Sequence, residues 1–216
     1  KGENHRCSLP IRQATSADTG EKQTYYAFDF ETANDSDFHE VNYSCARNID
    51  PEHRGDYIEH SNIADFCSWF IKLKSTTLIA HNMKGFDGWL ILHHLVKTYG
   101  KKPDSVIKAG EKIMYMKFGS VCFLDSLNHC AMPLSKFPKT FGMDESKFKK
   151  GYFPYKFNLF KNMNYIGPIP DREMFNRELM GVSKQHTYKN KNKNKKCQPE
   201  DKCDHCNFNR WYDEQE

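Results

Sequence analysis

Residues 24–33 read TYYAFDFETA, and the fold prediction starts from this stretch. The aromatic run over residues 24–28 predicts a buried β-strand at which the ordered part of the chain begins. Asp29 and Glu31 end that strand. Because alternate residues of a strand share a face, both carboxylates point the same way while the neighbouring phenylalanines point into the core.

Two acidic side chains on one face repel each other unless a positive charge lies between them. Mg²⁺ prefers one or two carboxylates together with substrate phosphates, so Asp29 and Glu31 are candidate metal ligands. The simpler alternative is a solvated strand end that carries two surface acids. The first stretch leaves both interpretations open.

A second stretch, residues 79–92, reads IAHNMKGFDGWLIL. It predicts the end of a short strand, a polar turn and the start of a helix. Polar side chains at the end of a strand lie where α/β sheets build their sites. The turn is therefore a candidate site, although an Asp before a helix, as Asp87 is here, usually caps that helix. Gly85 and Gly88 would permit close approach of a nucleic-acid backbone.

Hydrophobic periodicity predicts alternating strands and helices around these stretches. Ser61 is the expected N-cap of a helix with apolar positions at Ile63, Phe66, Cys67, Phe70 and Ile71. A helix over residues 88–99 is expected to bury Trp89, Leu92, Leu95, Val96 and Tyr99. Further elements are expected as strands at 41–46 and 76–80, a hairpin of 112–118 with 121–125, and a short helix over 133–141. This interleaving predicts an α/β fold around one sheet.

Composition divides the chain into a disordered tail over residues 1–22, a folded domain over 23–150 and an irregular extension over 151–216. No apolar run reaches the roughly 18 residues of a membrane span, and residues 1–21 lack the apolar core of a signal peptide. Eight cysteines without an export signal indicate a reducing, intracellular location. The net charge of +4 favours a polyanionic partner only weakly.

Asp-Phe-Glu-Thr at residues 29–32, followed by Asn-x-x-x-Phe-Asp at 82–87, resembles the first two exonuclease motifs of family B DNA polymerases. Asp-Ser-Leu at 125–127 and Lys-Gly-Tyr-Phe-Pro at 150–154 resemble motifs of the protein-primed members. The piece at 134–137 resembles the segment that follows Asp-Ser-Leu in those members. The pieces at 169–171 and 210–212 resemble parts of the polymerases of self-synthesising transposons, viruses and organellar plasmids. The resemblance covers residues 24–216 and implies a ribonuclease H-like mixed sheet flanked by helices.

The resemblance also implies a role for each matching residue. Asp29, Glu31 and Asp87 would bind two Mg²⁺ or Mn²⁺ ions. Lys150 would lie near the scissile phosphate, although it could instead be a solvated lysine. The single-stranded 3′ end of a DNA primer would be held by Thr32, Asn82, Phe86, Ser126 and Leu127. Ser126 could instead be an N-cap, and a terminal protein is a further partner that the resemblance suggests.

The third exonuclease motif of the family, Tyr-x-x-x-Asp, has no convincing copy after Phe153, and the polymerase palm motifs are also missing. We therefore expect the isolated chain to have little or no nuclease activity. Two alternatives stay open: a stand-alone 3′→5′ exonuclease, and a single-strand-binding remnant without catalysis. The sequence is compatible with a nuclear location and with association with an organelle or a virus.

Three cysteines near the end, Cys197, Cys203 and Cys206, have the spacing C-x5-C-x2-C, with His186 upstream and His205 between the last two. Cys-x-x-Cys is half of a zinc site, and structural zinc normally needs four ligands. Because no second well-spaced pair follows, the sequence argues against structural zinc.

Overall fold

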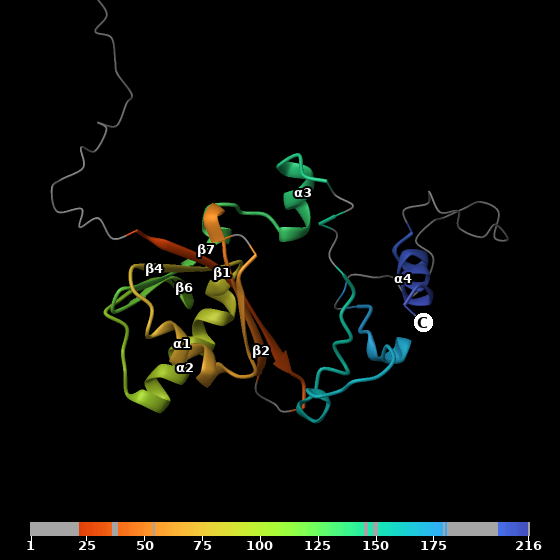
Figure 1. The fold of residues 1–216 in the computed structure, drawn as a ribbon, viewed down its shortest axis with the longest axis horizontal. Coiled ribbons are helices and arrows are strands. Elements are labelled where there is room, and N and C mark those ends of the chain that lie inside the picture. The colour runs from red at the N-terminus through yellow and green to blue at the C-terminus, as the bar shows by residue number, and fades with distance from the viewer. Residues whose placement is uncertain are drawn as a thin grey trace, which may run out of the picture.

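The computed structural model describes residues 22–35, 39–53, 55–144, 147–148, 151–178, 180 and 203–215 of the 216-residue chain. Within these residues a seven-stranded sheet is accompanied by α-helices (Figure 1). The strands are β1 (Thr24–Ala33), β2 (Glu40–Asn48), β3 (Tyr57–His60), β4 (Thr76–Ala80), β5 (Ser105–Ala109), β6 (Lys112–Phe118) and β7 (Val121–Asp125). The helices are α1 (Ile63–Phe70), α2 (Asp87–Tyr99), α3 (Phe137–Thr140) and α4 (Asp204–Asp213).

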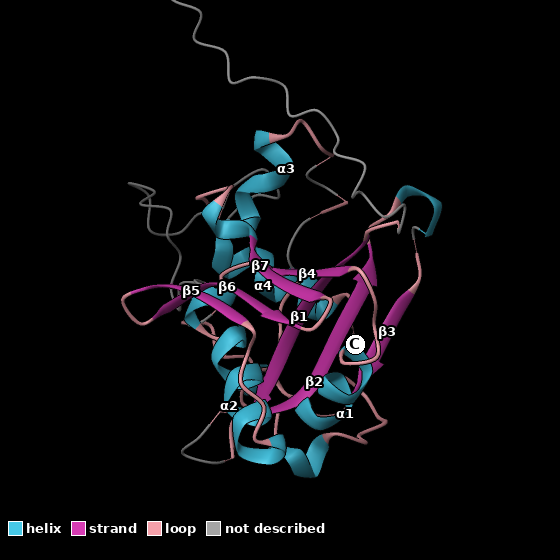
Figure 2. Cartoon of the chain, turned by 90° about the vertical axis from the view of Figure 1, so that its left-hand side faces the viewer, coloured by secondary structure: helices cyan, strands magenta, loops and turns pink. Residues whose placement is uncertain are grey.

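The strand order is β3-β2-β1-β4-β7-β6-β5. β4 runs parallel to both β1 and β7, and the remaining neighbours are antiparallel (Figure 2). The parallel centre brings the ends of β4 and β7 to the same edge of the sheet, since Ala80 pairs with Asp125. The α/β class with a mixed sheet and flanking helices is confirmed.

The main core lies between one face of the sheet and the helices α1 and α2, which lie side by side (Figure 1). Phe28 and Phe30 of β1 point into this core, as their alternation with Asp29 predicts. Phe66 of α1 packs against both rings at centroid distances of 5.3 and 4.8 Å. The aromatic run that begins the domain therefore anchors the first helix as well as the sheet.

Two details of the predicted helices are wrong. The N-cap of α1 is Asn62 and not Ser61. The side chain of Asn62 accepts a hydrogen bond from the backbone N–H of Asp65. On α2 the buried face is formed by Asp87, Gly88, Ile91 and Leu95. Trp89, Val96 and Tyr99 are exposed instead, and Ile71 lies beyond the end of α1 as another exposed side chain. The hydrophobic pattern predicted the wrong buried face for α2, because the first two buried residues of this helix are an acid and a glycine.

Three elements have no counterpart in the prediction. β3 and β5 are short strands at the two edges of the sheet, and most of their side chains are exposed. The extension, expected to be irregular, contains helix α4, which lies away from the sheet in Figure 1. Its Phe208 and Tyr212 form a small core of their own with Phe175. The other expected elements agree with the structure, including the β6–β7 hairpin, in which Phe118 pairs with Val121.

The predicted disordered tail lies outside the described residues apart from Lys22, and so do Lys150, Cys197 and His186. Among the described helices, none combines the length and apolar character that a bilayer crossing requires. The proposed division at residues 22 and 150 stays a prediction.

Candidate functional site

Asp29 and Glu31 lie on the face of β1 opposite the core. They belong to the C-terminal part of β1, which is no longer paired with the parallel strand β4. The pairing of β1 with β4 ends at Ala27, whereas β1 continues to Ala33 against β2. Asp29 is exposed and Glu31 is half-buried. The edge of β1 that faces β4 is therefore open to another partner from Phe28 onward.

Asp87 takes that place. It is the first residue of α2, and the backbone N–H of Phe30 is a hydrogen-bond donor to its carboxylate, as is its own backbone N–H. The side chain is only 4% exposed, and its Oδ1 atom has no hydrogen-bond partner in the described part of the chain. Asp87 thus bridges the start of α2 and the backbone of β1 between the two acids of that strand.

The position of Asp87 disfavours its charged form. Burial raises its pKa from 3.8 to about 7, and the negative charges of Asp29 and Asp125 add to the shift. The two backbone N–H donors oppose it. A buried carboxylate with an unpaired oxygen beside a second acid is an arrangement that a cation would stabilise.

The acids are not assembled into a complete metal site. Among the described residues, no three His, Cys, Asp or Glu side chains are grouped closely enough to hold a metal ion. The charge and the unpaired Oδ1 of Asp87 fit a divalent cation shared with Asp29. The structure thus provides a pair of acids suited to a cation, with Glu31 on the same strand.

Asp125, which the sequence reasoning did not assign a role, organises the neighbouring loop. It ends β7, is fully buried, and accepts the backbone N–H groups of Asn82 and Lys84, each at 2.9 Å, and of Leu127 at 2.8 Å. These bonds tie the turn after β4 to the turn after β7. An acid that ends a strand next to a polar turn is the signal that could have identified it.

Asn82 has left-handed backbone torsions (φ 70°) and an exposed side chain. A Cβ at Gly85 would lie 3.3 Å from that side chain, whereas Gly88 is buried and a Cβ there would lie 3.1 Å from the carbonyl oxygen of Met83. Gly88 therefore serves packing inside the protein. Its expected role in approaching a nucleic-acid backbone is not supported by this burial.

Ser126 lies beside the same turn and is not an N-cap, because Asp125 caps the 3₁₀ turn that Ser126 begins. The Ser126 hydroxyl lies 2.9 Å from His81 Nδ1 and 3.2 Å from the carbonyl oxygen of Ala80. Leu127 follows it, half-buried. The structure thus brings Asn82, Ser126 and Leu127 together around Asp125.

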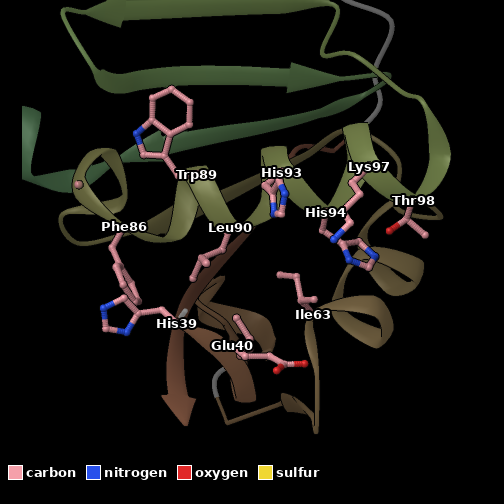
Figure 3. Close-up of a pocket in the computed structure, with 12 residues that line it drawn as sticks. His39, Glu40, Ile63, Phe86, Trp89, Leu90, His93, His94, Lys97 and Thr98 are labelled. Carbon is pink, nitrogen blue, oxygen red and sulfur yellow. The ribbon is translucent and has the colours of Figure 1, made fainter. Parts of the chain in front are cut away.

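Thr32 and Phe86 meet through a residue that the sequence did not single out, His39. The Thr32 hydroxyl lies 3.4 Å from His39 Nδ1, and the His39 ring packs edge-on against Phe86 at 5.1 Å. Phe86 lines a cavity of about 820 Å³ that follows one side of α2. Figure 3 shows Phe86 and His39 together at one end of it and His94 at the other.

The far end of this cavity is polar. His94 Nε2 is buried without a hydrogen-bond partner in the described residues, and burial together with His93 lowers the pKa of His94. Lys97 lies beside it (Figure 3). Trp89 also lines the cavity, and its Nε1 donates to the carbonyl oxygen of Glu111.

Two predicted sites depend on residues outside the described ranges. Lys150 cannot be placed relative to the acids, and Cys197 cannot be placed relative to the other cysteines. Cys203 is buried at the N-terminus of α4, and Cys206 follows one turn later, half-buried. His205 between them contacts Arg177 and Asn209.

A family of known proteins matches this chain. The family described as DNA polymerase type B, organellar and viral, matches residues 67–207. The chain belongs to this family. The match includes Asp87 and Asp125 and begins after β1, so the two acids of that strand lie outside it. The resemblance found in the sequence is confirmed at this level.

The fold of this chain is also found in a solved DNA polymerase. Phi29 DNA polymerase complexed with primer-template DNA is 21% identical, with a TM-score of 0.51, over 62% of this chain and 26% of the phi29 chain. The family B DNA polymerase from the archaeon Pyrobaculum calidifontis is 18% identical, with a TM-score of 0.41, over 58% of this chain and 19% of that one. This chain therefore spans about a quarter of the phi29 polymerase. No curated protein matches it.

Proposed function

We propose that this chain is the 3′→5′ exonuclease portion of a protein-primed type B DNA polymerase and binds the unpaired 3′ end of a DNA strand. The observation that carries the proposal is Asp87, which is joined to β1 between Asp29 and Glu31 and has a buried oxygen without a partner in the described part of the chain. Family membership makes DNA the expected substrate. A proofreading nuclease must act on any sequence, which suits contacts to the sugar-phosphate backbone and stacking on base faces.

In this proposal Asp29, Glu31 and Asp87 bind Mg²⁺ or Mn²⁺, which would activate water and stabilise the leaving 3′ oxygen. Without a cation, Asp87 is partly protonated near pH 7, because its pKa is about 7. Cation binding therefore releases a proton from this side chain. Lys150 keeps its proposed place near the scissile phosphate.

The 3′-terminal nucleotide is proposed to lie between the Asp125-organised turns and Phe86. Asn82 offers an exposed amide to the strand, and Thr32, Ser126 and Leu127 complete the surface around it. The half-buried ring of Phe86 offers a stacking partner. The cavity along α2 then receives the neighbouring nucleotides, with Lys97 available to a phosphate.

A second candidate, a single-strand-binding module without catalysis, is favoured by the lack of a three-acid group among the described residues. The two functions differ in their dependence on metal. A binding module would hold single strands equally well without metal, and Asp29→Ala or Asp87→Ala would not weaken it.

Calorimetric titration of the purified chain with Mn²⁺ tests the proposal. We expect Asp87→Asn to weaken Mn²⁺ binding at least about tenfold, since a buried ligand is lost. Asp171→Asn, a change at an exposed acid without a capping bond, is the matched control and should leave it unchanged. Equal Mn²⁺ affinity of wild type and Asp87→Asn would exclude the proposed metal role, and metal-independent strand binding would favour the second candidate.

A further inference from the structure

The strand that carries the acids is interrupted by a β-bulge immediately after Glu31. Glu31 pairs with Tyr43 and Thr32 pairs with Val41, so Asn42 is an extra residue on β2. A bulge leaves ladder groups unpaired, and such irregularities occur next to active sites, where they re-aim side chains. The bulge therefore lies directly beside the backbone of Thr32, at the acidic end of β1.

Asn158, far along the extension, binds both sides of this bulge. Its Nδ2 donates to the carbonyl oxygen of Thr32 at 2.9 Å, and its Oδ1 accepts from Asn42 Nδ2 at 2.5 Å. Its backbone carbonyl oxygen accepts the N–H of Asn34 at 3.1 Å. One residue of the extension thus binds β1, the bulge and the loop that follows β1.

The orientation of these amides is determined by the network. The carbonyl oxygen of Thr32 can only accept, so the Asn158 amide must direct its nitrogen to Thr32 and its oxygen to Asn42. Asn42, which is 5% exposed, is then left with a buried Oδ1 that has no partner among the described residues. An unsatisfied buried acceptor costs free energy, and the joint with Asn158 is formed despite that cost.

Neighbouring contacts extend the joint. The Asn34 side chain donates to the carbonyl oxygen of Tyr155, and the backbone N–H of Phe160 donates to Asp35 at 2.8 Å. Residues 155–160 therefore run along the end of β1. A spacer that only connects two domains would not be expected to make this set of specific bonds across more than 100 positions of sequence.

We infer that Asn158 is a positioning residue for the acidic end of β1. By binding the carbonyl oxygen of Thr32 and the extra residue Asn42, it fixes the backbone that carries Thr32 and, one residue earlier, Glu31. The inference rests on the proposed function insofar as Thr32 contacts the 3′ end of a strand. The extension is then part of the site and not an insertion beside it.

The test compares Asn158→Ala and Asn158→Asp with Asn162→Ala in the full 216-residue chain. Asn162 is a matched control because its Nδ2 donates to the carbonyl oxygen of Phe157 within the extension. Binding is measured for a linear oligothymidylate with a phosphorothioate 3′ linkage, which resists hydrolysis, and for a circular strand of equal length. Amide hydrogen exchange of Ala33 and Asn34 is followed in the same variants without DNA.

The preference for the linear strand is the ratio of its affinity to that of the circular strand. We expect this ratio to fall about tenfold in both Asn158 variants, with unchanged affinity for the circular strand. Exchange at Ala33 and Asn34 should accelerate by a similar factor. Asn162→Ala should change neither quantity. Asn158→Asp retains the acceptor for Asn42 and removes the donor to Thr32, which separates the two bonds.

Equal effects of the Asn158 and Asn162 changes, or no effect of either, would overturn the inference. A wild-type chain without preference for linear strands would instead contradict the proposed function. In that case the exchange data decide alone: if Asn34 exchanges no faster in Asn158→Ala than in Asn162→Ala, the positioning role is also rejected.

Discussion

Two buried acids at the same edge of the sheet, Asp125 and Asp87, have opposite environments. Asp125 accepts three backbone N–H bonds and binds together two turns. Asp87 has an oxygen without a partner among the residues that the structure describes, and its pKa is raised to about 7. Two acids of similar burial therefore differ in their surroundings: one binds two turns, and the other has an oxygen to which no described residue donates.

The largest expected effect belongs to Asp125. Asp125→Asn replaces one accepting oxygen with a donor that would face a backbone N–H, so we expect the free energy of unfolding to fall by about 3–5 kcal/mol. Urea denaturation followed by circular dichroism measures the change. A loss below about 1 kcal/mol would contradict the assignment of Asp125 as the residue that holds both turns.

Asp87→Asn should raise the free energy of unfolding, whereas Asp125→Asn lowers it. The pKa of Asp87 rises from about 4 in the unfolded chain to about 7 in the folded one. The unfolded chain therefore loses its proton first, and the resulting cost in stability grows from about pH 4 to about pH 7 and stays constant above. At pH 8 that cost is at most about 4 kcal/mol.

We therefore expect Asp87→Asn to stabilise the chain by about 2–4 kcal/mol at pH 8 and to reduce the decline of stability between about pH 4 and about pH 7. Thermal unfolding at a series of pH values measures both. An unchanged slope in the variant would show that Asp87 does not cause it, and the contrast with Asp125 would disappear.

Gly88 joins the two acidic environments, since it follows Asp87 and packs against the turn bound by Asp125. Its missing side chain leaves room for the carbonyl oxygen of Met83, 3.1 Å from where a Cβ would lie. Gly88→Ala should cost about 1–3 kcal/mol by overpacking. Gly85→Ala, which meets only the exposed side chain of Asn82, is the control and should cost less than about 0.5 kcal/mol in the same denaturation experiment.

Ser126→Ala should have the smallest effect. It removes the contacts of the hydroxyl with His81 and Ala80, a loss of about 1 kcal/mol. Because Asp125 holds the turn without the hydroxyl, backbone amide exchange at Asn82 should be unchanged. Faster exchange at Asn82 in this variant would mean that Ser126 shares the structural role given to Asp125.

The sequence predicted what depends on short-range patterns. Alternation along β1 placed Asp29 and Phe28 on opposite faces, and the strand-turn-helix pattern placed Asp87 at the start of α2. The end of β7 next to a polar turn could mark Asp125 as a candidate, but local patterns cannot show which groups it binds, because its donors lie up to 43 positions away. The same distance problem hid Asn158, whose partner Thr32 is 126 residues earlier.

The misassigned elements have physical reasons too. Edge strands β3 and β5 carry little buried surface, so they show no hydrophobic alternation for a pattern to detect. Helix α4 is polar overall, and its two buried rings, Phe208 and Tyr212, are spaced by four residues. The rings of Phe208 and Tyr212 are covered by the guanidinium groups of Arg177 and Arg172, which sequence periodicity does not register.

The most direct test of the account is an NMR titration of the Asp87 carboxyl carbon with and without Mg²⁺. We expect a pKa near 7 without the ion, and a clear decrease when Mg²⁺ is added, because the cation would favour the charged carboxylate. In Asp29→Asn the pKa without the ion should also fall, since a repelling charge is gone. Titration near pH 4 in the absence of Mg²⁺, or a pKa that Mg²⁺ leaves unchanged, would contradict a cation site shared by Asp29 and Asp87.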